Sequence, residues 1–181
     1  MKATIPTTVF DRSSPRLSAR SLASFLARAS RAAGLRGRAA VLITSNAEIR
    51  RLNARFRGKD SPTDVLSFPA GPLASGLAGD IAVSLDMAER NARRLGHSLE
   101  EEIRILVLHG ILHLAGYDHE NDQGEMERKE TALRRKLGLA SGLVERSRTD
   151  GPPRASRSSA SRIPGPSRRR PHGPDLRRAR T

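Results

Sequence analysis

Three of the five histidines in this 181-residue chain lie within the segment 109–119. His109 and His113 are four positions apart, so on a helix both imidazoles lie on the same face, one turn apart. Gly116 ends such a helix and lets the chain reverse, which brings His119 back toward the pair. Three neutral nitrogen ligands with one open coordination position are typical of catalytic zinc. The spacing therefore predicts a metal site at His109, His113 and His119.

The alternative is that these residues are ordinary core histidines. A single histidine on an apolar helix usually has that role. Burying an imidazole without a partner costs roughly a few kcal/mol, however, and three of them among Ile and Leu are explained better as metal ligands. His97, beside the helix-ending Gly96, and His172, in the basic tail, show no comparable pattern.

The same segment also limits the chemistry. Its spacing matches the metzincin peptidase pattern H-E-x-x-H-x-x-G-x-x-H, except that Gly110 stands where the pattern has Glu. Glycine cannot accept a proton from the attacking water, so peptide hydrolysis by the usual route is disfavoured. A Lewis acid that polarises a phosphoryl oxygen remains possible, and phosphodiester cleavage fits it. A zincin-type peptidase that takes its base from Asp118 or Glu120 is the alternative.

Composition points to a polyanionic partner. The chain has 33 Lys and Arg against 19 Asp and Glu, a net charge of +14, and no cysteine, which excludes disulfides and Cys-ligated zinc. Residues 141–181 hold 11 basic and three acidic side chains among many Pro, Gly and Ser. This composition predicts a disordered basic tail after a folded domain over 1–140. The tail is either a solvated extension or an arginine-rich arm that strengthens RNA binding.

Targeting signals are weak. The longest uncharged apolar run, 105–117, is shorter than the ~20 residues of a membrane-spanning helix, so we expect no membrane segment. The Arg- and Ser-rich residues 1–40 loosely resemble an organelle transit peptide, although the apolar spacing over 17–29 is also that of an amphipathic first helix.

The elements that position the histidines follow from periodicity and capping residues. Apolar spacing predicts helices over 17–33, 46–56, 86–96, 98–115 and 122–137. Short apolar and β-branched runs predict strands over 39–44, 64–68 and 79–85. Ser98 and Glu101 form a capping box at the start of the histidine helix.

Three motifs together resemble one family. They are HGILHLAGYDH at 109–119, RGKDSPTDVLSFP at 57–69 and GDI at 79–81. The histidine block alone is compatible with several zincin-like hydrolases, but together with the second motif it resembles the YbeY family of bacterial endoribonucleases. A following acidic helix with Met126 and Glu130 also fits, and the resemblance covers about residues 41–139.

The resemblance implies both a fold and a site. The expected fold is α+β and zincin-like, a small mixed sheet packed with helices, with the metal-binding helix across its centre. The expected cofactor is one zinc ion on His109, His113 and His119, with water or substrate in the fourth position. Arg57 is implied as catalytic, because its planar cation can grip the scissile phosphate, and Lys59 next to it would add a phosphate contact. A solvated basic loop is the alternative for both.

The resemblance also implies a function. It is that of a single-strand-specific endoribonuclease in 16S rRNA 3′ end maturation and late ribosome quality control, in the cytoplasm. Its expected partners are ribosomal RNA, the small ribosomal subunit, a ribosomal protein and an assembly GTPase. The second alternative, besides the peptidase, is a non-catalytic ribosome-assembly factor whose metal only stabilises the fold. Only Phe56 and Tyr117 are expected near the site, so we expect base stacking to be a minor contribution.

Overall fold

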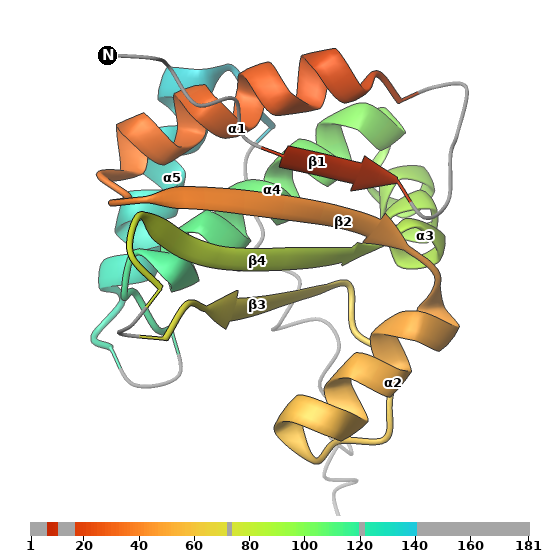
Figure 1. Ribbon diagram of the computed structural model, residues 1–181. Helices are drawn as coiled ribbons and strands as arrows, with labels where there is room; N and C mark the ends of the chain where they lie inside the picture. Colours follow the sequence, from red (N-terminus) through yellow and green to blue (C-terminus); the bar gives the residue numbers. More distant parts are fainter. Residues whose placement is uncertain (1–6, 11–16, 72–73, 120–121, 141–181) are drawn as a thin grey trace, which may run out of the picture. The chain divides into compact units, whose positions relative to one another are not determined.

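A mixed four-stranded sheet is the centre of the fold. The computed structural model describes residues 7–10, 17–71, 74–119 and 122–140 (Figure 1). Within them the strand order is β1 (Thr7–Phe10), β2 (Arg38–Thr44), β4 (Leu77–Ser84) and β3 (Val65–Pro69). β1, β2 and β4 run parallel, and β3 pairs antiparallel to β4 at the edge. The small mixed sheet expected from the sequence is confirmed.

Five helices accompany the sheet in the described residues: α1 (Ala19–Ala33), α2 (Asn46–Arg57), α3 (Leu85–Leu95), α4 (Leu99–Leu114) and α5 (Glu125–Leu137). A serine hydroxyl caps each of the first four by accepting a backbone N–H of the first turn. α5 begins differently. Its cap is Gly124, and the carboxylate of Asp122 accepts the backbone N–H groups of Gly124 and Met126, both at 2.7 Å.

The predicted elements are all present, with ends within three residues of those expected. One element was missed. β1 has only four residues, Thr7–Phe10, too few to show the alternation of apolar and polar side chains that identifies a strand. The predicted tail, 141–181, lies outside the described residues, so the boundary at 140 stays a prediction. None of the described helices is long and apolar enough to cross a membrane.

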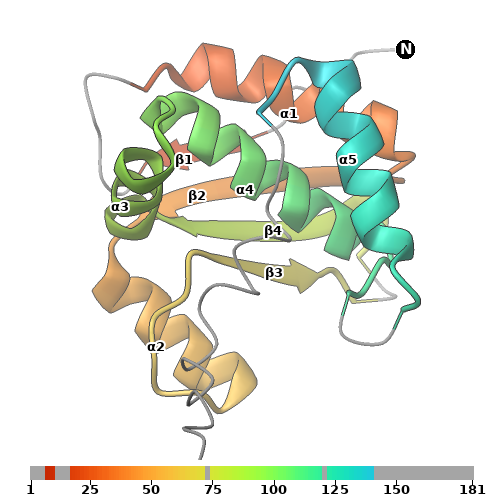
Figure 2. The ribbon, with the colours of Figure 1, turned by 180° about the vertical axis from the view of Figure 1, so that it is seen from behind.

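One face of the sheet carries the main core. Val41, Ile43, Ile81 and Val83 point toward α1 and α4 and are at most 1% exposed. α4 crosses this face, and α1 and α5 pack against α4 (Figure 2). α4 is therefore buried on almost every side, which explains its continuous apolar sequence. The expected central helix is confirmed.

The opposite face carries a smaller cluster under α2. Ile49 of α2 packs there with Leu66 of β3 and Ala82 of β4, and all three are at most 3% exposed. Partly buried side chains of Leu52 and Phe68 complete it. This packing holds α2 beside the edge strand β3, so the carboxyl end of α2 and the loop after it lie next to that strand.

Gly79 lies where β4 comes close both to β3 and to the end of α4. Its φ is +146°, and a Cβ atom there would lie 2.2 Å from the carbonyl oxygen of Phe68 and 2.8 Å from a methyl carbon of Leu114. Gly79→Ala should therefore lower the free energy of unfolding by about 3 kcal/mol, because the backbone of β3 has to move. Urea denaturation measures this loss.

Gly76→Ala is the matched control. Gly76 also has a positive φ, +76°, but nothing lies within 4 Å of its Cβ position, so the cost is only the backbone strain of about 1 kcal/mol. Equal losses for the two variants would contradict the close approach at Gly79.

Candidate metal centre

Three imidazoles converge at the carboxyl end of α4. The ring centroids of His109 and His113 are 4.8 Å apart, and those of His119 lie 5.4 Å and 5.2 Å from them. One nitrogen atom from each ring lies within 4.8 Å of the other two. Ligands of a tetrahedral ion at a Zn–N distance of about 2.0–2.1 Å are about 3.3 Å apart, so small side-chain rotations bring all three nitrogens to that spacing. The three residues fit a single metal ion.

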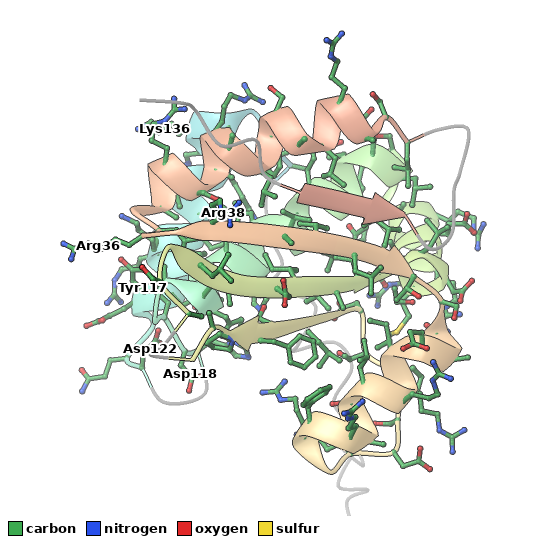
Figure 3. All side chains as sticks on the ribbon, in the orientation of Figure 1. Arg36, Arg38, Tyr117, Asp118, Asp122 and Lys136 are labelled. Carbon is green, nitrogen blue, oxygen red and sulfur yellow. The ribbon has the colours of Figure 1, made fainter. Side chains whose placement is uncertain are left out.

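The turn after α4 brings His119 back. Gly116 has a φ of +92°, and its N–H donates to the carbonyl of His113 at 3.0 Å. The N–H of Tyr117 then donates to the carbonyl of Leu112, also at 3.0 Å. These bonds close the helix in a left-handed turn, as Gly116 predicts. Tyr117, Asp118 and Asp122 lie together at this end of the molecule (Figure 3).

His113 is electrically neutral around pH 7. Burial, followed by the charges of the neighbouring His109 and His119, lowers its pKa to about 4. A histidine must be unprotonated to bind a metal ion. His113 therefore needs to lose no proton before it coordinates one.

A buried carboxylate orients His109. Glu130 of α5 is 2% exposed, and its Oε2 lies 2.9 Å from Nδ1 of His109. Its other oxygen lies 2.5 Å from the guanidinium of Arg134, which is also 2% exposed. Burial by itself would raise the pKa of Glu130, but the hydrogen bond and charge of His109 and the ion pair with Arg134 hold it below its usual value.

An ionised carboxylate only accepts hydrogen bonds, so Nδ1 of His109 carries the proton. Its Nε2, on the other side of the ring, faces Nε2 of His113 at 3.1 Å. A carboxylate behind a ligand histidine is common in metal sites and fixes the ring's tautomer and orientation. Sequence reasoning noted Glu130 only within a motif. It missed this role, because 21 residues separate Glu130 from His109.

The sequence-predicted residues share one cavity. A space of about 1000 Å³ is lined by His109, His113 and His119 together with Arg57 and Lys59 from the end of α2 and its loop. Glu127 and Glu130 of α5 line the same space. The cavity therefore brings two cations, Arg57 and Lys59, to the imidazole cluster, together with the carboxylates of Asp64, Asp118, Asp122, Glu127 and Glu130.

The loop that carries these cations is tied to α2. Nδ2 of Asn53, which is 4% exposed, donates to the carbonyl of Ser61 at 2.7 Å. The N–H of Lys59 donates to the carbonyl of Asn53 at 3.3 Å. Arg50 and Asp60 form a two-bond ion pair, each bond 2.6 Å long. Three separate contacts thus hold residues 58–61 in place at the cavity rim.

Packing explains why glycine occupies position 110. Gly110 faces the sheet, where a Cβ atom would lie 2.8 Å from Cγ2 of Ile81 and 3.1 Å from Oγ of Ser67. The hydroxyl of Ser67 also donates to the carbonyl of Gly110 at 3.3 Å. The position therefore has no room for the glutamate that the metzincin pattern places there.

Fold and site together define a class. An α+β domain whose central helix and following turn carry three converging imidazoles has the architecture of a zincin-like metal-binding protein. A sequence profile described as Endoribonuclease YbeY matches residues 13–138. The chain belongs to this endoribonuclease YbeY family.

Individual relatives agree with this result. The chain is 61% identical over 130 residues to Endoribonuclease YbeY of Koribacter versatilis, an alignment that covers 72% of this chain and 84% of that protein. It is 49% identical over 106 residues to Endoribonuclease YbeY of Nautilia profundicola, covering 59% and 76%. The solution structure of TM1509 from Thermotoga maritima is similar with a TM-score of 0.52 and 33% identity, covering 74% of this chain and 89% of that one.

The pair Glu130 and His109 gives a prediction about metal affinity. Glu130→Gln preserves shape but loses the charge that pairs with Arg134 and fixes the His109 tautomer. We expect metal affinity to fall about 10- to 100-fold, as for other changes behind a ligand histidine. Competition with a chromogenic chelator measures it.

Glu127→Gln is the control, because Glu127 lies exposed on the same helix and lines the same cavity. It should bind metal as the wild type does. A Glu130→Gln variant with unchanged affinity would rule out the orienting role.

Proposed function

We propose that this chain is a zinc-dependent endoribonuclease that cleaves single-stranded RNA. The observation that carries the proposal is the shared cavity, which Arg57 and Lys59 line together with His109, His113 and His119. The names of the relatives support RNA as the substrate. Three nitrogen ligands in a chain without cysteine suit zinc.

The mechanism divides the work between the metal and the protein. His109, His113 and His119 would hold the zinc ion, which supplies Lewis-acid stabilisation of a phosphate oxygen when bound. The guanidinium of Arg57 binds the non-bridging oxygens of the scissile phosphate and stabilises the negative charge that develops on them. Lys59 adds a second positive charge at the rim, and Glu130 keeps His109 oriented throughout.

Gly110 leaves the metal helix without a glutamate base at that position. Two nucleophiles are compatible with this arrangement: water, or the 2′-hydroxyl of the ribose next to the scissile phosphate. The products distinguish them, because attack by the 2′-hydroxyl leaves a cyclic phosphate end and attack by water does not.

Charge elsewhere on the molecule supports a polynucleotide substrate. Arg36, Arg38 and Lys136 are exposed and lie at the same end of the molecule as Tyr117 (Figure 3). For Arg38, the strand pairing agrees with this placement. Arg38 pairs with Leu77 at the start of β4, close to Gly79, which contacts Leu114 at the end of α4. These three cations, called the basic strip below, place positive charge at this end of the molecule, outside the cavity lining.

The biological setting is part of the proposal. We assign the endoribonuclease to residues 1–140 and infer that 141–181 is a basic extension. The substrate we propose is ribosomal RNA, at the 3′ end of 16S rRNA in the small subunit, in the cytoplasm, with a ribosomal protein and an assembly GTPase as partners. The metallopeptidase and the non-catalytic assembly factor are not favoured, because the relatives are named endoribonucleases.

The central test removes the cation opposite the histidines. Arg57→Ala should lower kcat for a single-stranded RNA about 100- to 1000-fold without changing the metal content, because only the developing charge loses its partner. The metal-free enzyme and His113→Ala should be inactive. Gel analysis of labelled RNA fragments measures cleavage.

Arg51→Ala is the control, since Arg51 is an exposed arginine on the same helix. It should cleave as the wild type does. Full activity in a metal-free preparation would reject the mechanism, and metal-dependent cleavage of casein with none of RNA would favour the peptidase.

The basic strip gives a salt-dependence prediction. Replacing Arg36, Arg38 and Lys136 by Gln should reduce the slope of log affinity against log salt by about two, at roughly 0.7 for each lost contact with single-stranded RNA. A control triple variant replaces three exposed arginines elsewhere, Arg20, Arg90 and Arg93, and has the same net charge. Equal slopes for the two triple variants would show that net charge alone, and not the strip, attracts RNA.

A further inference from the structure

Phe56 is an aromatic side chain that the fold leaves open to solvent. Its exposed fraction is 57%, the highest among the large apolar side chains of the described residues. It directly precedes Arg57, the cation that lines the cavity. A single exposed apolar residue needs no special explanation. Phe56 differs because its neighbours orient its ring.

Two contacts hold the ring of Phe56. It packs against the ring of Phe68 in an edge-to-face geometry, with centroids 5.2 Å apart and an interplanar angle of 63°. The guanidinium carbon of Arg55 lies 5.1 Å from the centroid of Phe56. Phe68 in turn packs against the buried cluster of Ile49, Leu66 and Ala82. A ring supported in this way loses little conformational freedom when a flat ligand stacks on it.

The aromatic pair and the phosphate-binding groups lie on opposite sides of the edge strand. Along β3, Ser67 and Pro69 line the cavity, whereas Leu66 and Phe68 alternate to the face under α2. Along α2, Asn53 and Arg57 line the cavity. Leu52 and Phe56 form the neighbouring stripe, which continues over Phe68. A chain that leaves the cavity past Arg57 therefore meets Phe56 on the other side of β3.

We infer that Phe56, supported by Phe68 and flanked by Arg55, is a stacking subsite for an unpaired nucleobase. The inference rests on the proposed function, since the base belongs to a nucleotide next to the phosphate that Arg57 binds. Every nucleobase presents a flat π face, so the subsite accepts all four. A base inside a duplex is already stacked on its neighbours and cannot occupy it. The subsite thus selects single strands without selecting a sequence.

A tryptophan at this position reports stacking directly. The chain contains no tryptophan, so Phe56→Trp creates a single fluorophore at the subsite. We expect a single-stranded oligoribonucleotide to quench its fluorescence in a stopped-flow experiment, before turnover. An abasic ribose-phosphate oligomer of the same length binds through phosphates alone and should leave the fluorescence unchanged. Equal effects of the two oligomers, or none with either, would overturn the subsite.

Truncation of the ring tests the energetic contribution. Phe56→Leu keeps an apolar side chain but loses the π face, and Phe56→Ala removes both. Both variants should weaken binding of single-stranded RNA roughly 5- to 100-fold, the range for loss of one base–aromatic stack, with KM raised more than kcat is lowered. Affinity for the abasic oligomer should not change. If Phe56→Leu binds RNA as the wild type does, the ring is only part of the hydrophobic cluster.

Leu95→Ala is the matched control, because Leu95 is another exposed apolar side chain, 42% exposed, on α3. It should bind and cleave RNA normally. The two proposals fail separately. Cleavage that depends on Arg57, together with unquenched fluorescence of the Phe56→Trp variant, rejects only the stacking subsite. A wild-type protein that does not cleave RNA rejects the nuclease, and the quenching experiment still decides whether Phe56 binds a base.

Discussion

The structure depends on the close packing of α4 against the sheet at Gly110. Because this residue has no side chain, the helix backbone approaches Ile81 and Ser67 more closely than any other residue would permit. That contact fixes the rotation of α4 about its axis. Because one side of the helix is held against β4, His109 and His113 line the cavity. The missing side chain that excludes a glutamate at position 110 is therefore also what positions the ligands.

Charge in the site is mixed, because Arg57 and Lys59 line the cavity together with five carboxylates, of which Glu130 is buried and paired. Glu130 and Arg134 are both buried and paired, so together they contribute little net charge to the cavity. Breaking such a pair by removing one partner is costly, which makes it a rigid support for His109. The imidazoles are held ready for a metal ion, with His113 neutral around pH 7. In the proposed mechanism, the attraction for a phosphate would come from Arg57, Lys59 and a metal ion held by the histidines.

Sequence reasoning succeeded where the information is local. The spacing of His109 and His113, the turn at Gly116 and the Ser98 cap each depend on a few neighbouring residues, and the structure shows them as expected. It failed where distant segments meet. Glu130 reaches His109 only because α5 packs on α4, and no spacing within either helix encodes that contact. β1 was missed because its four residues show no period of their own.

The proposed role of Phe56 goes beyond what the sequence predicted. The sequence placed only Phe56 and Tyr117 near the site, so base stacking was expected to be a minor contribution. The fold places Phe25 in the core at 1% exposure and leaves Phe56 at 57%, with a second ring behind it. One oriented ring is enough when a cation next to it fixes the neighbouring phosphate, because the two contacts then bind the same strand and the second costs little additional freedom. The protein would thus bind a phosphate on one side of β3 and an unpaired base on the other. These two contacts distinguish single from double strands without any sequence-specific contact to a base.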